Sequence, residues 1–223
     1  MPVRLGSCGA PNLSRSIVLS GDLAYVSDMS DGLRFISVAD PTDPHEIRTS
    51  IPLGETRDVA VRDTLVYAAT SDSGMRIISV ADPQRVYEIG RTRTRPYREI
   101  ELDGDYAYLG DYGARLRVLD VRDPTNPAET AFVGVPGNVG GIALAENLVH
   151  MATGGGGLRV IDISDPVNPY EVGHYLTEGY ARRVATSGNL AFVTSDWAGL
   201  RIIEFLGSGV EEPPDERPSF ANH

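Results

Sequence analysis

The chain has 223 residues, enough for one domain with a substantial core, and its formal net charge is −11. This acidic balance argues against nucleic acid as a partner, because phosphate binding needs a basic surface. All 20 basic side chains are arginine, which excludes Schiff-base chemistry and lysine general bases, and the single cysteine, Cys8, excludes an internal disulfide.

Short runs rich in β-branched and aromatic residues, separated by turn residues, begin near residue 16 and predict a series of strands. The first four, named A to D from the axis outward, are residues 16–20, 23–27, 33–38 and 47–51. Asp40-Pro41 ends strand C, because proline cannot donate to a ladder and restricts the residue before it. No window shows a helical period, so we expect almost no helix.

The same frame recurs along the chain around an arginine in strand C. Successive copies of this arginine are 42, 41, 42 and 42 residues apart, at Arg34, Arg76, Arg117, Arg159 and Arg201. Four copies continue into an Asp-Pro step, at Asp40, Asp82, Asp123 and Asp165. A β-rich period of this length predicts an all-β, five-bladed β-propeller with four antiparallel strands per blade. We expect the arginine to be structural, because it recurs in every blade.

The ends of the chain predict how the ring closes. The fifth copy stops after strand C, at Phe205, and residues 3–7 resemble the start of a D strand, with Pro2 placed before Arg15 as Pro169 is before Arg182. We expect this N-terminal strand to complete the last blade and remove an exposed strand edge. Residues 1–206 then form the propeller, and residues 207–223, rich in proline and acidic side chains, are expected to be a disordered tail.

Residues 157–169, with the sequence GLRVIDISDPVNP, resemble the repeat of the LVIVD family, and the likeness recurs five times over residues 1–206. The family consists of bacterial and archaeal propeller repeats that often occur in surface proteins. The resemblance therefore implies a propeller, expected to be bacterial and monomeric, and implies no single activity.

Candidate site residues are sought on the face formed by the D-to-A and B-to-C connections, since loops on a rigid scaffold commonly carry function. One aligned column, Arg15, Arg57, Arg98, Gly140 and Arg182, belongs to the repeat pattern and is expected to be structural. The next column, at the start of strand A, is Ser16, Asp58, Glu99, Gly141 and Arg183. Asp58 and Glu99 with Arg183 could act as an acid and base pair at the channel mouth, or form an ion-pair ring that neutralises the channel.

Blade four has almost no side chains on this face, because Gly140, Gly141 and residues 154–157 are all glycine. A cleft over blade four is therefore predicted, walled by aromatic and charged groups of its neighbours. The candidate ligand-binding residues are Arg98, Asp111, Tyr112, Tyr180, Asp196 and Trp197. The alternative is that the glycines make a tight loop and that Trp197 packs on a neighbouring blade.

Two functional classes remain open. The first is a binding module that engages a small polar ligand or a protein partner at the loop face around the channel. The second is a cofactor-independent hydrolase, lyase or cyclase that uses Asp58 and Glu99 with Arg183. The four histidines show no metal spacing, so neither metal nor cofactor is expected, and His150 is expected to be a packed ring. No membrane insertion is expected; the location is cytoplasmic if the chain is full length, and the cell surface or outside the cell if a signal was removed.

Overall fold

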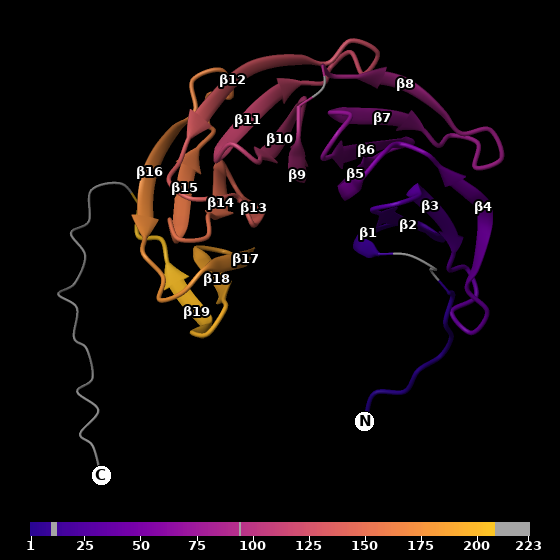
Figure 1. Ribbon diagram of the computed structural model, residues 1–223, viewed down its shortest axis with the longest axis horizontal. Helices are drawn as coiled ribbons and strands as arrows, with labels where there is room; N and C mark the ends of the chain where they lie inside the picture. The colour runs from indigo at the N-terminus through magenta and orange to yellow at the C-terminus, as the bar shows by residue number, and fades with distance from the viewer. Residues whose placement is uncertain (10–12, 94, 208–223) are drawn as a thin grey trace.

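The structure is a computed structural model that describes residues 1–9, 13–93 and 95–207. Its strands form five antiparallel sheets, the blades, arranged in an arc around a central axis (Figure 1). Blades one and two contain β1 (Ser14–Ser20), β2 (Leu23–Asp28), β3 (Gly32–Ser37), β4 (His45–Ile51), β5 (Thr56–Arg62), β6 (Leu65–Thr70), β7 (Met75–Ser79) and β8 (Tyr87–Arg91).

Blades three and four repeat this arrangement, with the first strand nearest the axis and the fourth outermost. They contain β9 (Tyr97–Asp103), β10 (Tyr106–Asp111), β11 (Arg115–Asp120), β12 (Ala128–Gly134), β13 (Gly141–Ala145), β14 (Leu148–Ala152), β15 (Leu158–Asp162) and β16 (Tyr170–Tyr175). In the described part of the chain, blade five has three strands: β17 (Ala181–Ser187), β18 (Leu190–Ser195) and β19 (Gly199–Glu204).

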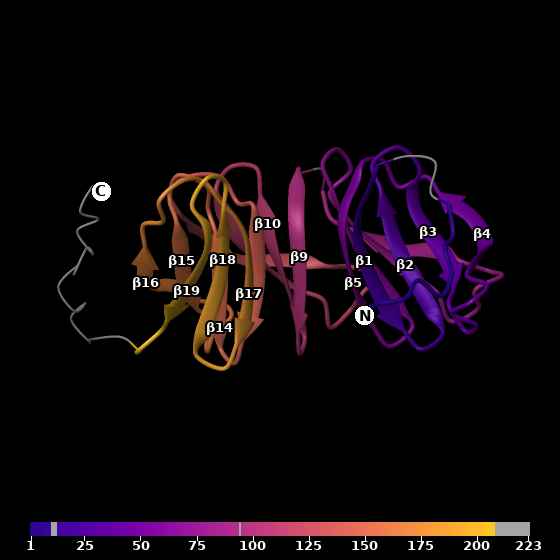
Figure 2. The same cartoon turned by 90° about the horizontal axis from the view of Figure 1, so that it is seen from below.

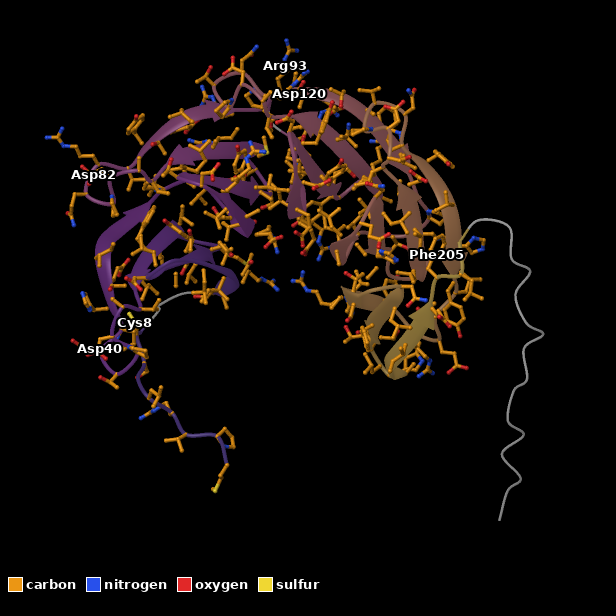
Figure 3. The ribbon with its side chains drawn as sticks, turned by 180° about the vertical axis from the view of Figure 1, so that it is seen from behind. Cys8, Asp40, Asp82, Arg93, Asp120 and Phe205 are labelled. Carbon is orange, nitrogen blue, oxygen red and sulfur yellow. The ribbon has the colours of Figure 1, made fainter. Side chains whose placement is uncertain are left out.

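The Asp-Pro steps form turns between strands C and D at the outer rim of the arc, where Asp40 and Asp82 are labelled in Figure 3. A carboxylate oxygen of Asp40 accepts hydrogen bonds from the Thr42 amide, at 2.8 Å, and from the Thr42 hydroxyl, at 2.6 Å. Asp123 and Thr125 form the same pair of contacts in blade three. These local bonds stabilise the turn that follows strand C in blades one and three.

The arginine of strand C pairs with a glutamate of strand D twelve residues later in each four-stranded blade. These ion pairs are Arg34–Glu46 at 2.6 Å, Arg76–Glu88, Arg117–Glu129 at 2.7 Å and Arg159–Glu171 at 2.9 Å. The contacts are those of a structural residue, in agreement with the interpretation from its recurrence.

The core lies between the blades. The clusters of buried side chains join strands B and C of one blade to strand A of the next, as where Leu33 and Phe35 of blade one pack with Val59 of blade two. Burying one such side chain is worth about 1.5 to 3 kcal/mol. The interfaces between neighbouring blades therefore hold the arc together.

The two ends of the arc each leave one of these faces uncovered. On blade five, Leu200 is 55% exposed and Ile202 is 60% exposed, although the equivalent residues of the other blades are buried. On blade one, Ile17 is 63% exposed, whereas its equivalents Val59 and Ile100 are buried. Figure 2, seen from below the arc, shows blades one and five standing apart. The described residues thus form an open arc with two unpartnered apolar faces.

The N-terminal segment does not complete blade five, which corrects the predicted ring closure and the fourth strand of that blade. Residues 3–7 form no strand, and the N-terminus lies on the blade-one side of the opening (Figure 1). Gly6 lies against the Asp-Pro turn of blade one, where an added Cβ would come within 2.4 Å of the Pro41 carbonyl oxygen, and Gly90 of β8 lies in the same way against Pro124 of the next blade. Like charges oppose pairing of this segment with β19. If Pro2 is aligned with Pro169, Arg4 takes the place of Glu171 and would face Arg201. The expected tail from residue 208 onward lies outside the described residues.

Candidate functional site

Asp58 lies at the start of β5 and joins three blades through its carboxylate. One oxygen accepts the Val59 amide at 2.9 Å, and the other accepts the Ile100 amide of blade three, also at 2.9 Å. The Ser16 hydroxyl of blade one donates a further bond. Burial raises the pKa of Asp58 above its usual value, and these hydrogen bonds oppose the rise. Both oxygens are engaged within the protein, which is the arrangement of a structural carboxylate.

Glu99 is buried at the start of β9 and forms an ion pair with Arg183, two blades away. Gly141 of the intervening blade makes room for this contact, because a Cβ there would lie 3.1 Å from Arg183 Cα and 3.3 Å from its Cδ. Burial and the neighbouring Asp58 charge raise the pKa of Glu99 to about 7, although Arg183 opposes the shift. The arginine expected at the channel mouth thus crosses blade four to reach blade three.

Glu101 is a third carboxyl of this region that the sequence interpretation missed. It is half-buried on β9, and burial together with the Asp58 charge raises its pKa to about 7. Comparison of the five repeats would have identified it, because the residues at the equivalent position are apolar: Val18, Ala60, Ala143 and Ala185. Asp58, Glu99 and Glu101 therefore form a carboxyl cluster at the inner strands of blades two and three, in which Glu99 and Glu101 can hold protons near neutral pH.

Tyr112 lies at the β10–β11 loop of blade three, between two arginines. The guanidinium carbons of Arg98 and Arg57 lie 5.1 Å and 5.8 Å from the centre of its ring. Arg57 also pairs with Glu55, whereas in the described chain no carboxylate lies within ion-pair distance of Arg98. Contacts of this kind hold an aromatic ring and a cation together at the surface.

Asp111, expected to bind ligand, is buried and points into blade three. Its carboxylate accepts a hydrogen bond from Arg117 Nε at 2.6 Å and another from the Gly113 amide at 2.7 Å. The residue fixes the loop that carries Tyr112, and it does not belong to the exposed surface.

Blade five brings the remaining predicted residues together. Arg182 forms two hydrogen bonds with Asp196, at 2.6 and 2.8 Å, and its guanidinium lies 5.5 Å from the centre of the Tyr180 ring. Trp197 is 77% exposed, and its indole lies against Gly179, where an added Cβ would approach it to 3.2 Å. An exposed indole supported from beneath in this way is a feature of contact surfaces.

Side chains of blade five lie over two of the blade-four glycines, where the cleft was predicted. A Cβ at Gly154 would meet the Tyr180 ring at 2.8 Å, and Gly141 lies beneath Arg183 as described above. Small residues here allow close packing of the next blade. The loop face is therefore a surface of aromatic rings and arginines, with Arg57, Arg98 and Tyr112 at one end and Tyr180, Arg182 and Trp197 at the other; we call these six residues the aromatic–arginine surface.

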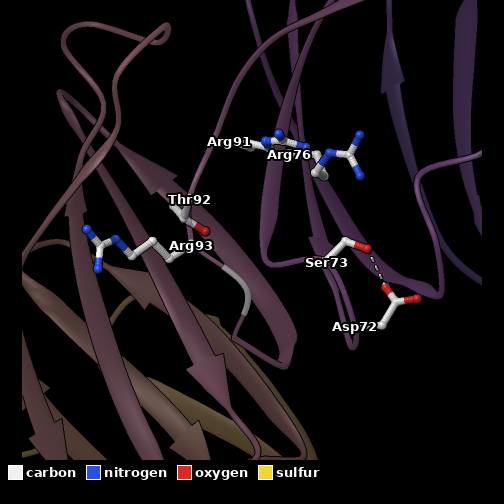
Figure 4. A pocket seen from close by; sticks show the side chains of 6 residues that line it. All are labelled: Asp72, Ser73, Arg76, Arg91, Thr92 and Arg93. Carbon is white, nitrogen blue, oxygen red and sulfur yellow. Dashed lines mark hydrogen bonds between the residues drawn. The ribbon is translucent and has the colours of Figure 1, made fainter.

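A polar depression lies on blade two, and Figure 4 shows it from close by. None of the predicted site residues lines it; the lining residues are Asp72, Ser73, Arg76, Arg91, Thr92 and Arg93. Arg76 is held there by Glu88, and Ser73 donates a hydrogen bond to Asp72 at 2.9 Å. The depression is thus lined by the structural arginine and by the connection that leads into blade three.

His150, at the strand B position held by tyrosine in the first three blades, is buried and stacks edge-on against Phe205 at 6.4 Å. Burial lowers its pKa. Within the described ranges, no group of three or more His, Cys, Asp or Glu side chains is arranged to hold a metal ion. Over the same ranges, no helix is long and apolar enough to span a membrane.

The fold is shared with solved propeller structures at low sequence identity. The chain resembles the computationally designed Ika8 protein with a TM-score of 0.63 and 9% identity, over 90% of this chain and 74% of that one. A chain of the mitotic checkpoint complex gives 0.72 and 10%, over 85% and 60%, and the RRP9 WD40 repeats give 0.69 and 12%, over 88% and 68%. At these identities the likeness establishes the fold alone.

A search of curated proteins gives no match. The family model for the LVIVD repeat matches five times, over residues 13–49, 53–94, 97–133, 136–177 and 178–204. These matches follow the five blades and cover most of the sequence, in agreement with the resemblance found from the repeated Gly-Leu-Arg frame. The chain therefore belongs to the family of LVIVD-repeat proteins.

Proposed function

We propose that this chain is a binding module that engages a protein partner through the aromatic–arginine surface. The observation that carries the proposal is the 77% exposure of Trp197, which lies on Gly179 rather than packing into a neighbouring blade. Leaving an indole in water forgoes its large apolar contribution to stability, and tryptophan, tyrosine and arginine are the residues that dominate binding energy at protein interfaces.

Shape favours a protein partner over a small ligand. Arg183 and Tyr180 occupy the space above the blade-four glycines, so the surface offers rings and guanidinium groups side by side in place of a deep cleft. Small-molecule sites are usually concave and enclose most of the ligand, whereas protein partners bind broad surfaces.

Charge indicates the chemistry of the partner. Arg57 and Arg182 each have a carboxylate within the described chain, but Arg98 stacks on Tyr112 with none within ion-pair distance. A partner carboxylate at Arg98 would form a charge-assisted hydrogen bond there. We therefore expect the bound segment to combine an acidic residue with an apolar side chain that covers Trp197.

The enzymatic alternative rests on Asp58, Glu99 and Arg183. Both oxygens of Asp58 accept internal hydrogen bonds, and Glu99 is paired with Arg183. These contacts indicate a structural role for both carboxyl groups. A raised pKa of about 7 at Glu99 is nevertheless suited to proton transfer. Glu99→Gln is the discriminating variant: it would stop turnover in an enzyme and leave partner affinity unchanged in the proposed module.

The test selects binders to the intact chain from a displayed peptide library and measures their affinity. Trp197 is the single tryptophan, so its fluorescence reports directly on partner contact. We expect a blue shift on binding, and a loss of about 30-fold in affinity for Arg98→Ala, the roughly 2 kcal/mol typical of an interface hot spot. Trp197→Ala should weaken binding as much, measured with a labelled peptide.

Tyr87→Ala is the matched control, because Tyr87 is another exposed aromatic ring, on the outer strand β8. It should leave affinity unchanged. Binders that respond to Tyr87→Ala and are indifferent to Trp197→Ala and Arg98→Ala would place the functional surface elsewhere and contradict the proposal.

A further inference from the structure

The polar depression on blade two lies where this blade departs from the repeat. Its volume is about 470 Å³, within the range of small-molecule sites. Three arginines line it, Arg76, Arg91 and Arg93, in a chain whose formal net charge is −11. Two of them belong to the sequence RTRTRP of residues 91–96, whereas the corresponding residues 50–55, 132–138 and 174–179 contain no arginine. The basic lining is therefore specific to blade two and is not required by the fold.

Arg91 lies opposite another cation. In the ladder between β7 and β8 it faces Arg76, the repeated arginine, whereas the residues at this place in blades three and four are Phe132 and His174. In blade three the guanidinium of the repeated arginine lies 5.5 Å from the centre of the Phe132 ring. Like charges directly opposite each other in a sheet are destabilising. Residues that break a local rule in this way are expected at functional sites.

Arg91 and Arg93 are the cations that remain available to a ligand. Glu88 accepts a hydrogen bond from Arg76 Nε at 2.9 Å, and its other oxygen lies 3.9 Å from Arg91, whose side chain is 69% exposed. Arg93 is exposed at the outer rim of the arc (Figure 3), and no carboxylate of the described chain lies within ion-pair distance of it. Two guanidinium groups are thus free to bind anionic oxygens.

The backbone that carries Arg93 is held in place. The Thr92 hydroxyl accepts a hydrogen bond from the Met75 amide at 2.9 Å. Gly74 lets the connection pass closely over the start of β7, because a Cβ there would lie 2.8 Å from the Arg93 carbonyl oxygen. A ligand therefore meets a connection whose position is already fixed, which lowers the entropic cost of binding.

Asp72 is the carboxylate among the lining residues. It accepts a hydrogen bond from the Ser73 hydroxyl at 2.9 Å and lies against Gly54 of the preceding connection. Figure 4 shows Ser73 between Asp72 and Arg76, with Arg93 on the other side of the depression. The arginines therefore outnumber the nearby carboxylates, Asp72 and Glu88, and the depression favours an anion.

We infer that the depression on blade two binds a phosphate group through Arg91 and Arg93. A phosphate ester carries a charge of about −1.5 to −2 at neutral pH, which matches two unneutralised guanidinium groups. Arginine also matches the geometry of phosphate oxygens with its fork of donors. The site is distinct from the aromatic–arginine surface, and the inference does not rest on the proposed function.

The probes are inorganic phosphate and a glycine–alanine peptide with a single phosphoserine, each titrated into the full chain by calorimetry. Both should bind, and the same peptide with unmodified serine should not. Arg91→Gln and Arg93→Gln should each weaken phosphate binding at least tenfold. Arg85→Gln is the matched control, because Arg85 is an exposed arginine at the outer turn of the same blade and its loss changes the net charge equally. Arg98→Ala should also leave phosphate binding unchanged.

The two probes distinguish the sources of the phosphate group. If the phosphopeptide binds at least tenfold more tightly than phosphate, the ligand is a phosphorylated protein segment; otherwise it is a small phosphate ester. Either result supports the inference. No saturable binding of either probe, or equal weakening by Arg85→Gln and Arg91→Gln, overturns it.

Arg91→Phe separates ligand binding from folding. It places the residue of blade three opposite Arg76 and removes the like-charge contact, so it should raise the melting temperature and abolish phosphate binding. Phosphate should raise the melting temperature of the natural chain and leave that of Arg91→Phe unchanged. A variant that still binds phosphate, whatever its melting temperature, would contradict the assignment of Arg91.

Discussion

Blades two and five are built on the same repeat, yet equivalent residues differ in burial and in their ion-pair partners. Ile77 in β7 is fully buried against blade three, whereas Ile202 in β19 is 60% exposed. Arg76 is paired across to an outer strand, whereas Arg201 contacts a loop residue. The difference teaches that in a repeat array a side chain's role is set by its neighbours, since each repeat buries its faces only against adjacent repeats.

The largest difference in stability between equivalent substitutions is expected at the repeated arginine of strand C. Arg117 is buried and holds both Asp111 and Glu129, so Arg117→Ala leaves the buried Asp111 without its partner. We expect this to lower the free energy of unfolding by about 3 to 5 kcal/mol, the range for breaking a buried pair. Arg201→Ala should cost about 1 kcal/mol or less. Urea denaturation of both variants measures the contrast, and equal losses would show that the β19 edge is covered in solution.

The same comparison can be made with an apolar residue. Ile77→Ala should cost about 2 to 5 kcal/mol because it removes a buried side chain from the interface with blade three. Ile202→Ala should change stability by less than about 0.5 kcal/mol, as for other exposed positions. A large effect at Ile202 would mean that blade five is partnered, either by blade one or by another molecule.

A smaller effect is expected at Glu101, which departs from the repeat. Its pKa is raised from 4.5 to about 7, so the folded state holds a proton more tightly than the unfolded state. The stability that this contributes is complete below about pH 4.5, declines as the pH rises to about 7 and is absent above it.

Glu101→Gln keeps the group neutral at every pH. Relative to the natural chain, its advantage should therefore appear between pH 4.5 and 7 and level off above pH 7, on the order of 1 kcal/mol or a rise in melting temperature of about 2 to 4 °C. Melting curves at pH 4.5 and 8 provide the measurement. A variant that is less stable than the natural chain at pH 8 would contradict the expectation.

The smallest effect is expected from the N-terminus. Deleting residues 1–9 removes a segment that lies mostly exposed beside blade one, so we expect a change below about 0.5 kcal/mol. A large fall in melting temperature would restore the ring closure predicted from the sequence.

The repeat frame predicted the five blades, the strand positions and the structural arginine, because periodic residues report local structure and packing that every blade shares. It did not predict the open arc. Residues 3–7 read as an outer strand by spacing, but Arg4 in place of the pairing glutamate was the signal against it. Spacing predicts where a strand can lie, and the charge of its side chains decides which neighbour it accepts.

The site was predicted less well than the fold. The glycines of blade four were interpreted as empty space, but their function depends on what blade five places above them, and Arg183 and Tyr180 are long enough to fill it. Asp111 was assigned to the surface because it ends a strand at the loop, but it is bound to Arg117 within the blade. Sequence columns identify which residues begin or end a strand, and they do not show which way a polar side chain turns when two partners compete for it.

The ion pair between Glu99 and Arg183 has a consequence for the order of unfolding. Solenoid and propeller arrays commonly unfold as a chain of nearest-neighbour units, so a terminal repeat can fray while the others persist. Here the opening of blade five would withdraw the cation from a carboxylate buried in blade three, two repeats away. The terminal blade is therefore coupled beyond its neighbour, and hydrogen exchange in β17 and β9 should report one cooperative opening event.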